Sequence, residues 1–263
     1  VKIYFTNARL SAWTHTFIES TFNYDSKVDR ANLSPFATFS LKGLSIFKDI
    51  NAPKVTIENF QTRAVIYRLI MGKLTLRNLN IDGFNINLSY DEITKFRYTK
   101  FLDNLNYYMS SFFKSRPLNN VFQINNIKAD NGNLTLRVNQ NLLFFKNILL
   151  EADIYKPSDF FDGTLFFYLN QKRSSSYTSV ALNFRFDKND NSFYITDLKF
   201  DGIPIAVEGK IILKERGFEA DFLVNSSSQN LANILTSIFD NDSYIEFGEF
   251  LKDMNANVKI NYL

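Results

Sequence analysis

Residues 74–88 read Leu-Thr-Leu-Arg-Asn-Leu-Asn-Ile-Asp-Gly-Phe-Asn-Ile-Asn-Leu. Apolar and polar residues alternate on both sides of the Asp82-Gly83 pair, and this period of two is typical of a β-strand with one buried face. An Asp-Gly pair between alternating runs predicts a hairpin turn, because glycine readily takes a positive φ. Because two polar residues separate Leu76 from Leu79, the apolar residues after them would lie on the opposite face of the strand unless a bulge keeps them on the same face.

Two further stretches repeat this order of apolar alternation, two-residue slip and turn pair. Residues 122–136 have Asp-Asn-Gly at the turn position, and residues 193–207 have Asp-Gly there. Because the three copies are unequally spaced, they do not form a solenoid of fixed period. The pattern predicts a loosely repeated hairpin with one apolar and one polar face, although the core of an ordinary β-sandwich has the same periodicity.

Helical spacing of apolar residues occurs between the strand patterns. It predicts a helix over about residues 8–22, with Asn7 as its N-cap, a second over about 91–115 and a short third over about 229–239. The polar stretch 23–32 links the first helix to the strands. Roughly a dozen strands without alternating helices exclude a Rossmann or TIM-barrel fold.

The sequence therefore predicts a mainly β fold with a few helices, in which residues 1–263 form one elongated domain. The expected architecture is a curved antiparallel sheet that forms an open apolar groove. The composition agrees, since 28 Phe and 13 Tyr against one Trp suit half-buried pleated surfaces. The chain begins at Val1 and ends on the strand pattern 258–263, which indicates a fragment of a longer chain.

The charge, the cysteine content and the length of the apolar runs exclude several classes of function. The net charge is +3, with lysine and arginine spread along the chain, so a nucleic-acid groove is not expected. The absence of cysteine excludes disulfides and thiolate metal sites. No run of about 18 apolar residues occurs, so the sequence itself contains no membrane-spanning helix.

The sequence contains few of the residues and motifs on which catalysis usually depends. His15 is the single histidine, and its place in the first predicted helix favours a packed or surface side chain. None of the common nucleotide-binding, nucleophile-elbow or zinc-protease motifs occurs. The acidic stretch 187–198 lacks the glycine and the glutamate of a calcium loop. The prediction is a protein that is not an enzyme and has no catalytic residue, no cofactor and no metal.

Residues 41–46 (Leu-Lys-Gly-Leu-Ser-Ile) and the stretch from Gly72-Lys73-Leu74 to Ile86 resemble the N-terminal region of AsmA-like proteins. The units at 122–136 and 193–207 are similar to the recurring hairpins of that family and of TamB-like proteins. The resemblance implies a chain in the periplasm of a two-membrane bacterium, tethered to the inner membrane by an N-terminal anchor upstream of this sequence. It also implies a repeating β-groove that carries phospholipid towards the outer membrane, without catalytic residues.

The predicted function is thus a periplasmic segment of a phospholipid conduit, with phospholipid or another acyl-chain lipid as its partner. The predicted lipid-binding positions share the parity of the apolar face and are Leu76, Ile86, Ile124, Leu136, Phe184, Ile195, Ile205 and Phe222. Two alternatives stay open at this point. One is a scaffold that helps outer-membrane proteins to assemble through a sheet edge. The other is a closed, lipocalin-like β-barrel that binds a small apolar ligand.

Overall fold

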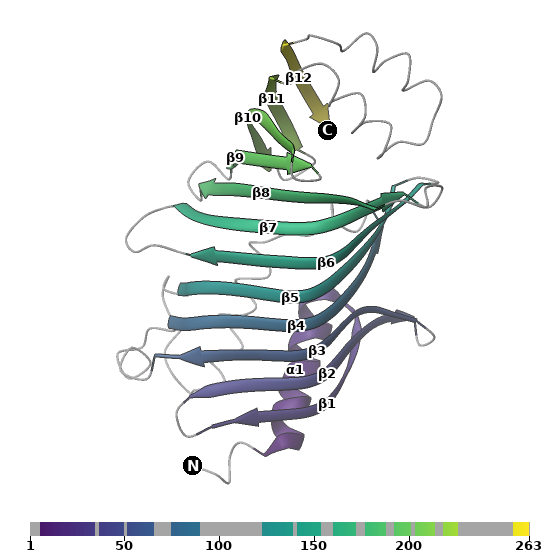
Figure 1. Cartoon of the computed structure of the whole chain (residues 1–263). Coiled ribbons are helices and arrows are strands. Elements are labelled where there is room, and N and C mark those ends of the chain that lie inside the picture. Colours follow the sequence, from purple (N-terminus) through teal and green to yellow (C-terminus); the bar gives the residue numbers. More distant parts are fainter. Residues whose placement is uncertain are drawn as a thin grey trace. The chain divides into compact units, whose positions relative to one another are not determined.

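The structure is a computed structural model (Figure 1). It describes residues 6–34, 37–49, 52–65, 75–89, 123–138, 141–153, 160–171, 177–187, 192–200, 203–213, 218–225 and 255–262. The chain divides into two compact units. Unit 1 comprises Val1–Asn87 with Phe96–Gly132, and unit 2 comprises Leu88–Lys95 with Asn133–Leu263.

One helix and twelve strands make up the described part of the chain. They are α1 (Asn7–Phe22), β1 (Asp25–Leu33), β2 (Thr38–Asp49), β3 (Ala52–Ala64), β4 (Thr75–Ser89), β5 (Gln123–Val138), β6 (Asn141–Asp153), β7 (Phe160–Gln171), β8 (Thr178–Asp187), β9 (Ser192–Phe200), β10 (Ile203–Leu213), β11 (Phe218–Asn225) and β12 (Asn255–Tyr262). The helices predicted over about 91–115 and 229–239 lie outside the described residues. The prediction of a single domain over the whole chain stays a prediction.

Within each unit the strands follow one another in sequence order. In unit 1, β1 pairs with β2, β2 with β3 and β3 with β4, always antiparallel. In unit 2 the antiparallel pairs run from β6 with β7 to β11 with β12. Among the described pairs, none joins the first and last strands of a unit, so each sheet is open. The predicted mainly β fold with an open, curved antiparallel sheet is confirmed, and the closed barrel considered above is not formed.

Helix α1 is confirmed, but its cap is one residue earlier than predicted. Thr6 is the N-cap, and its side chain accepts a hydrogen bond from the Arg9 amide at 3.4 Å. Asn7 lies in the first turn, where its Oδ1 accepts from the backbone N–H of Ala31 in β1 at 2.6 Å. Both residue types are good caps, so sequence alone does not separate them. Asn23 ends the helix at φ 57°, donating its N–H to the Glu19 carbonyl.

The segment 23–32, interpreted from sequence as a polar link, contains most of strand β1. Its register with β2 places Val28 opposite Leu44 and Ala31 opposite Leu41. The strand is difficult to recognise because charged residues outnumber apolar ones, as is common where a strand lies at the edge of a sheet.

A polar crease crosses unit 1 from β1 to β5. In each of these strands two consecutive residues lie on the face opposite the core, and apolar residues of the core face stand on either side of them. These pairs are Asp29-Arg30, Lys42-Gly43, Glu58-Asn59, Asp82-Gly83 and Asp130-Asn131. Cross-strand register aligns the pairs from β1 to β4, and Asn131 Nδ2 donates to Asp82 Oδ1 at 2.8 Å. Because all the strands change phase on the same row, the sheet keeps its pairing while each strand bends (Figure 1).

Three residues of the crease, in β2, β4 and β5, have a positive φ: Gly43 (61°), Gly83 (64°) and Asn131 (54°). This corrects two of the three predicted hairpins. β4 runs through Gly83 and β5 runs through Asn131 as single strands. The third prediction is confirmed, since β9 and β10 pair with Phe200 opposite Ile203. Glycine at positive φ serves a bend within a strand as well as a turn between strands.

The sequence left open whether the two-residue slip turns the apolar face of a strand over or whether a bulge keeps it on one side. The structure has bulges. Leu79 lies opposite Thr62 and Leu76 opposite Ala64, so β4 has one residue more than β3 between these pairs. Leu76 and Leu79 therefore share a face. The same shift occurs in β9 around Thr196.

Replacing Gly83 with alanine should lower the free energy of unfolding by about 1–2 kcal/mol, since an L-residue at positive φ costs that much. The added Cβ would also lie 2.6 Å from the Glu58 carboxylate, which has to move. Gly83→Asn should cost less, because asparagine tolerates this conformation and already occupies it at Asn131. Urea unfolding measures the difference, and exposed Asn85→Ala in the same strand is the control. A Gly83→Ala protein as stable as the parent would contradict the crease.

Candidate functional site

In unit 1 the apolar face of the sheet is the face on which α1 packs. Leu10 and Ile18 of the helix are 1% and 4% exposed and form one core with Ala31, Leu41 and Leu44. This packing buries aliphatic side chains from three elements, and it holds α1 across β1 and β2.

The buried Thr14 of α1 forms its hydrogen bond within the helix. The Thr14 hydroxyl donates to the Leu10 carbonyl at 2.9 Å, so a residue only 5% exposed still has its hydrogen bond. The Trp13 ring lies 6.0 Å from Phe17 and 6.4 Å from Phe39 of β2. The helix is thus an integral part of the core at this end of unit 1.

Further along the same face, β4 presents a mixture of buried and half-buried apolar side chains. Leu76 and Phe84 are buried, whereas Ile81 and Ile86 are half-buried. The Phe84 ring packs directly against the Cα of Gly132 in β5, where an added Cβ would lie 1.8 Å from Phe84 Cζ. Glycine is therefore needed at this position for the ring to lie flat over the neighbouring strand.

Unit 2 has a strongly aromatic apolar face. The Phe184 ring in β8 stacks on Phe193 of β9 at 4.7 Å and meets Phe161 of β7 edge-on at 6.3 Å. Phe161 also lies 5.0 Å from Phe186. Phe184 is 5% exposed, but the other three side chains have more solvent contact. A continuous strip of partly accessible aromatic rings results.

The structure brings three predicted site positions together on one row of unit 2. Phe184 lies opposite Ile195, Ile195 opposite Gly209, and Gly209 opposite Phe222. Directly opposite residues share a face, so these positions belong to the same apolar surface. Ile205 takes the register position opposite Leu198, on the neighbouring row.

The other predicted positions fall on β4 and β5. Leu76 and Ile86 lie on the apolar face of β4, opposite Ala64 and Val55. Leu136 is half-buried and has the same strand parity as Gly132. The side chains of Ile124, Ile205 and Phe222 lie outside the described part of the molecule. Ile124 is therefore assigned only to β5, and Ile205 and Phe222 only to their register positions in β10 and β11. A single interior shared by all eight side chains stays a prediction.

The aromatic strip includes residues that the sequence analysis missed. Phe161, Phe167 and Phe193 point to the apolar face of unit 2, and Phe145 lies 5.2 Å from Phe167. Residues 165–169 are all apolar or aromatic, so alternation gives no parity there. The pairing of Leu165 with Leu182 resolves it, because it places the odd-numbered residues of β7 with the apolar residues of β8.

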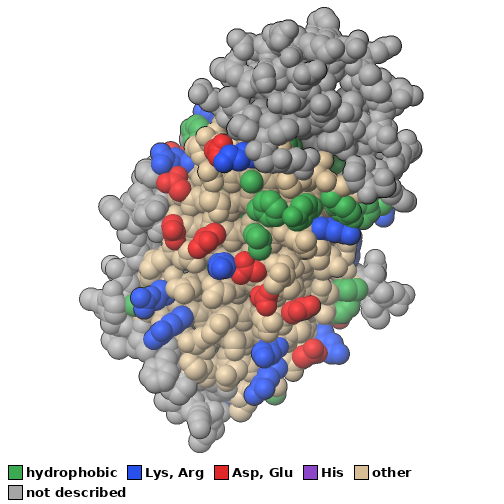
Figure 2. Space-filling model, viewed as in Figure 1, with side chains coloured by type: hydrophobic (Ala, Val, Ile, Leu, Met, Phe, Trp, Pro, Cys, Tyr) green, Lys and Arg blue, Asp and Glu red, His purple; other side chains and the backbone are tan. Residues whose placement is uncertain are grey.

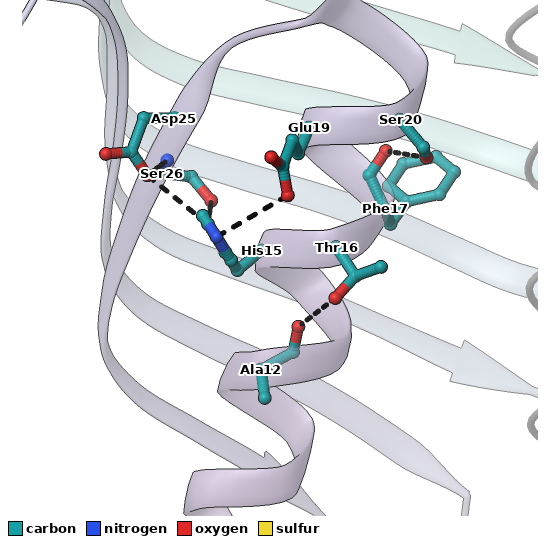
Figure 3. Close-up of polar contacts among 8 residues, drawn as sticks. All are labelled: Ala12, His15, Thr16, Phe17, Glu19, Ser20, Asp25 and Ser26. Atoms are coloured by element: carbon teal, nitrogen blue, oxygen red, sulfur yellow. Dashed lines mark hydrogen bonds and ion pairs between the residues drawn. The ribbon is translucent and has the colours of Figure 1, made fainter.

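His15 lies in a polar cluster between α1 and β1 (Figure 3). Its Nδ1 is 3.3 Å from Ser26 Oγ and 3.4 Å from Asp25 Oδ1, while Nε2 is 3.8 Å from Glu19 Oε2. A serine–histidine–acid relay needs the serine and the acid hydrogen-bonded to different ring nitrogens. Here the serine and the nearer acid share one nitrogen, and Glu19 is beyond hydrogen-bond distance. The cluster ties the helix to β1, and we assign it no catalytic role.

In the described ranges, no three His, Asp or Glu side chains are grouped so as to hold a metal ion. Within the same ranges, no helix has the length and apolar character needed to cross a bilayer.

Comparison with known proteins adds no relative. No protein-family model matches the chain, and no curated protein matches its sequence. The resemblance carried by residues 41–46 and 72–86 therefore stays a prediction.

Proposed function

We propose that the chain binds phospholipid acyl chains along its apolar faces and acts as a non-enzymatic segment of a lipid-transfer conduit. The observation that carries this proposal is the partly accessible apolar face of unit 2. Its rows hold Phe186, Phe193, Ile195 and Leu198, all half-buried on an open sheet. A protein core of this composition would normally exclude water from nearly all such side chains. On this face, an additional apolar molecule that covers the half-buried side chains would exclude the water.

The energetics favour acyl chains as that occupant. Burial of each CH₂ group contributes about 0.8 kcal/mol, so one chain of ~16 carbons gains on the order of 10 kcal/mol. Contact with Leu, Ile and Phe side chains is non-directional. A lipid can therefore move from row to row without breaking specific bonds, as transfer requires.

The crease suits the same role. By bending every strand of unit 1 on one row, it curves the sheet around its apolar face without interrupting the backbone pairing. Polar side chains then occupy the outer face, where Asn59 and Asn131 both donate to Asp82. This arrangement supports a sheet whose apolar face contacts lipid and whose polar face contacts water.

On this proposal the chain is an AsmA-like or TamB-like segment in the periplasm, tethered to the inner membrane and carrying phospholipid towards the outer membrane. The alternative of a scaffold that pairs with other strands gains no support from β1. That edge strand carries Lys27, Asp29 and Arg30, and charges of this kind oppose strand addition.

Purified protein should carry phospholipid when it is expressed in a bacterial host. Native mass spectrometry should show masses of bound lipid, and organic extraction should recover phospholipids with mixed acyl chains, because apolar contact does not select a headgroup. Protein stripped of lipid should take up a fluorescent phospholipid from vesicles. Stripped, folded protein that takes up no labelled phospholipid would contradict the proposal.

A further inference from the structure

The polar face of unit 2 carries an apolar patch, formed by Leu149, Phe166, Tyr168 and Tyr177 and hereafter called the outer patch. A bulge in β6 creates it. Lys146 lies opposite Tyr168 and Leu149 opposite Phe166, so β6 has one residue more than β7 between these pairs. Asn147 provides the positive φ of 51° that this arrangement needs. Without the extra residue, Lys146 and Leu149 would lie on opposite faces of the sheet.

The outer patch is accessible and ordered by ring contacts. Leu149 is 43% exposed, Tyr168 36% and Tyr177 44%. Phe166 and Tyr168 meet edge-on at 5.2 Å, and Lys146 Nζ lies 4.8 Å above the Tyr177 ring. Figure 2 shows hydrophobic side chains gathered on a face that is otherwise scattered with charged ones.

Charge on this face is separated along the strands. At the end of β7 near residue 162, Asp162 pairs with Arg185 at 2.7 Å, and Asp153 lies opposite Asp162 in β6. Hydrogen bonding to Asp162 raises the pKa of Arg185 above its ordinary value, so the guanidinium stays charged. At the other end, the charged residue in contact with the outer patch is Lys146.

Tyrosine, leucine and lysine together suit one kind of partner. Tyrosine rings are amphipathic and gather at the boundary between headgroups and acyl chains of a bilayer. A leucine beside them inserts into the hydrocarbon, while a lysine with its long stem reaches an anionic headgroup.

We propose that the outer patch docks unit 2 on the surface of an anionic lipid bilayer, with the end of β6 and β7 that carries Lys146 and Tyr168 towards the membrane. This goes beyond the proposed function and does not depend on it. A protein could bind a bilayer through its outer face whether or not its apolar face carries lipid.

Co-sedimentation with vesicles tests the docking. The full chain should bind vesicles of phosphatidylcholine with roughly 30% phosphatidylglycerol more strongly than vesicles of pure phosphatidylcholine, because the first carry an anionic surface. Lys146→Gln should weaken binding to the anionic vesicles about five-fold, the effect of one lysine near such a surface. Leu149→Ser combined with Tyr168→Ser should weaken it at least ten-fold. Lys42→Gln, which removes an exposed lysine in unit 1, is the charge-matched control and should bind as the parent does.

Three results would overturn the proposal. The first is no difference between anionic and neutral vesicles, and the second is equal loss in Lys42→Gln and Lys146→Gln. The third is a protein that associates with itself in the absence of vesicles and loses this association in the double variant, since the patch would then serve a protein partner. Circular dichroism of each variant confirms that the sheet is retained. Because all the substituted side chains are exposed, folding should be little affected.

Discussion

Replacing Gly132 with alanine should destabilise the protein by about 1–3 kcal/mol, the usual cost of forcing an extra group into a packed site. The new Cβ would lie 1.8 Å from Cζ of Phe84 and within 2.4 Å of two further ring carbons. The ring therefore has to leave the position in which it is 9% exposed. The φ of Gly132 is not in the left-handed region, so the backbone itself accepts alanine.

A double-mutant cycle isolates this contact. Phe84→Ala alone should cost about 3–5 kcal/mol, as removal of a buried aromatic ring does. In that background Gly132→Ala should cost little, because the three nearest atoms to its Cβ all belong to the Phe84 ring. The double variant should thus be more stable than the sum of the two single effects predicts, and urea unfolding measures the difference. Additive effects would show that Phe84 does not lie on Gly132.

Gly163 offers an internal comparison. Its position under Phe184 in unit 2 is similar, but an added Cβ there would also lie 2.8 Å from the backbone oxygen of Glu151. Phe184→Ala should therefore rescue Gly163→Ala only in part. Both pairs use an aromatic ring to cover a glycine on a neighbouring strand, which protects the exposed backbone and fixes the strand register.

Much of this fold follows from the period-two alternation of the sequence. Residues 74–88 and 193–207 show which faces are apolar, and that parity matches Phe84, Ile86, Ile195 and Leu198 in the structure. The same local pattern could not separate a hairpin from a creased strand. Both need a glycine or asparagine at positive φ, and the choice depends on whether the neighbouring strand is long enough to pair on both sides of it.

Other features depend on contacts between segments that are distant in sequence. β1 is a strand because β2 pairs with it and α1 covers Ala31, although its own sequence is largely polar. In residues 165–169 the parity is set by β8, not by the residues themselves. The outer patch likewise depends on the bulge at Asn147, and no sequence pattern predicts this bulge.

The candidate site was predictable to a similar extent. The alternation identified Phe184 and Ile195 as members of one apolar face, and the register places them directly opposite each other. It did not identify the rings of Phe161 and Phe193 that surround Phe184, because ring contacts depend on pairing across three strands. Sequence periodicity thus predicts which face is apolar, whereas the identity of the side chains that meet on it comes from strand order and register.

A carboxylate at the centre of the apolar row should block lipid uptake. Ile195 is half-buried, and it lies between Phe184 on one neighbouring strand and Gly209 on the other. Ile195→Asp should lower the free energy of unfolding by roughly 1–3 kcal/mol, less than in a closed core, because water still reaches the site. Uptake of a fluorescent phospholipid should fall at least ten-fold, since placing a carboxylate against hydrocarbon costs more than the roughly 1.4 kcal/mol that ten-fold represents.

The adjacent residue provides a matched control for this prediction. Thr196 is exposed in the bulge of β9, so Thr196→Asp adds the same charge one position along the chain but away from the apolar row. It should change neither the unfolding midpoint nor lipid uptake by more than the experimental error. A folded Ile195→Asp protein that takes up phospholipid as well as Thr196→Asp would argue against a lipid track on this face. If Ile195→Asp unfolds outright while conservative Ile195→Val remains folded, the row is a closed hydrophobic core, and the open-face proposal is wrong.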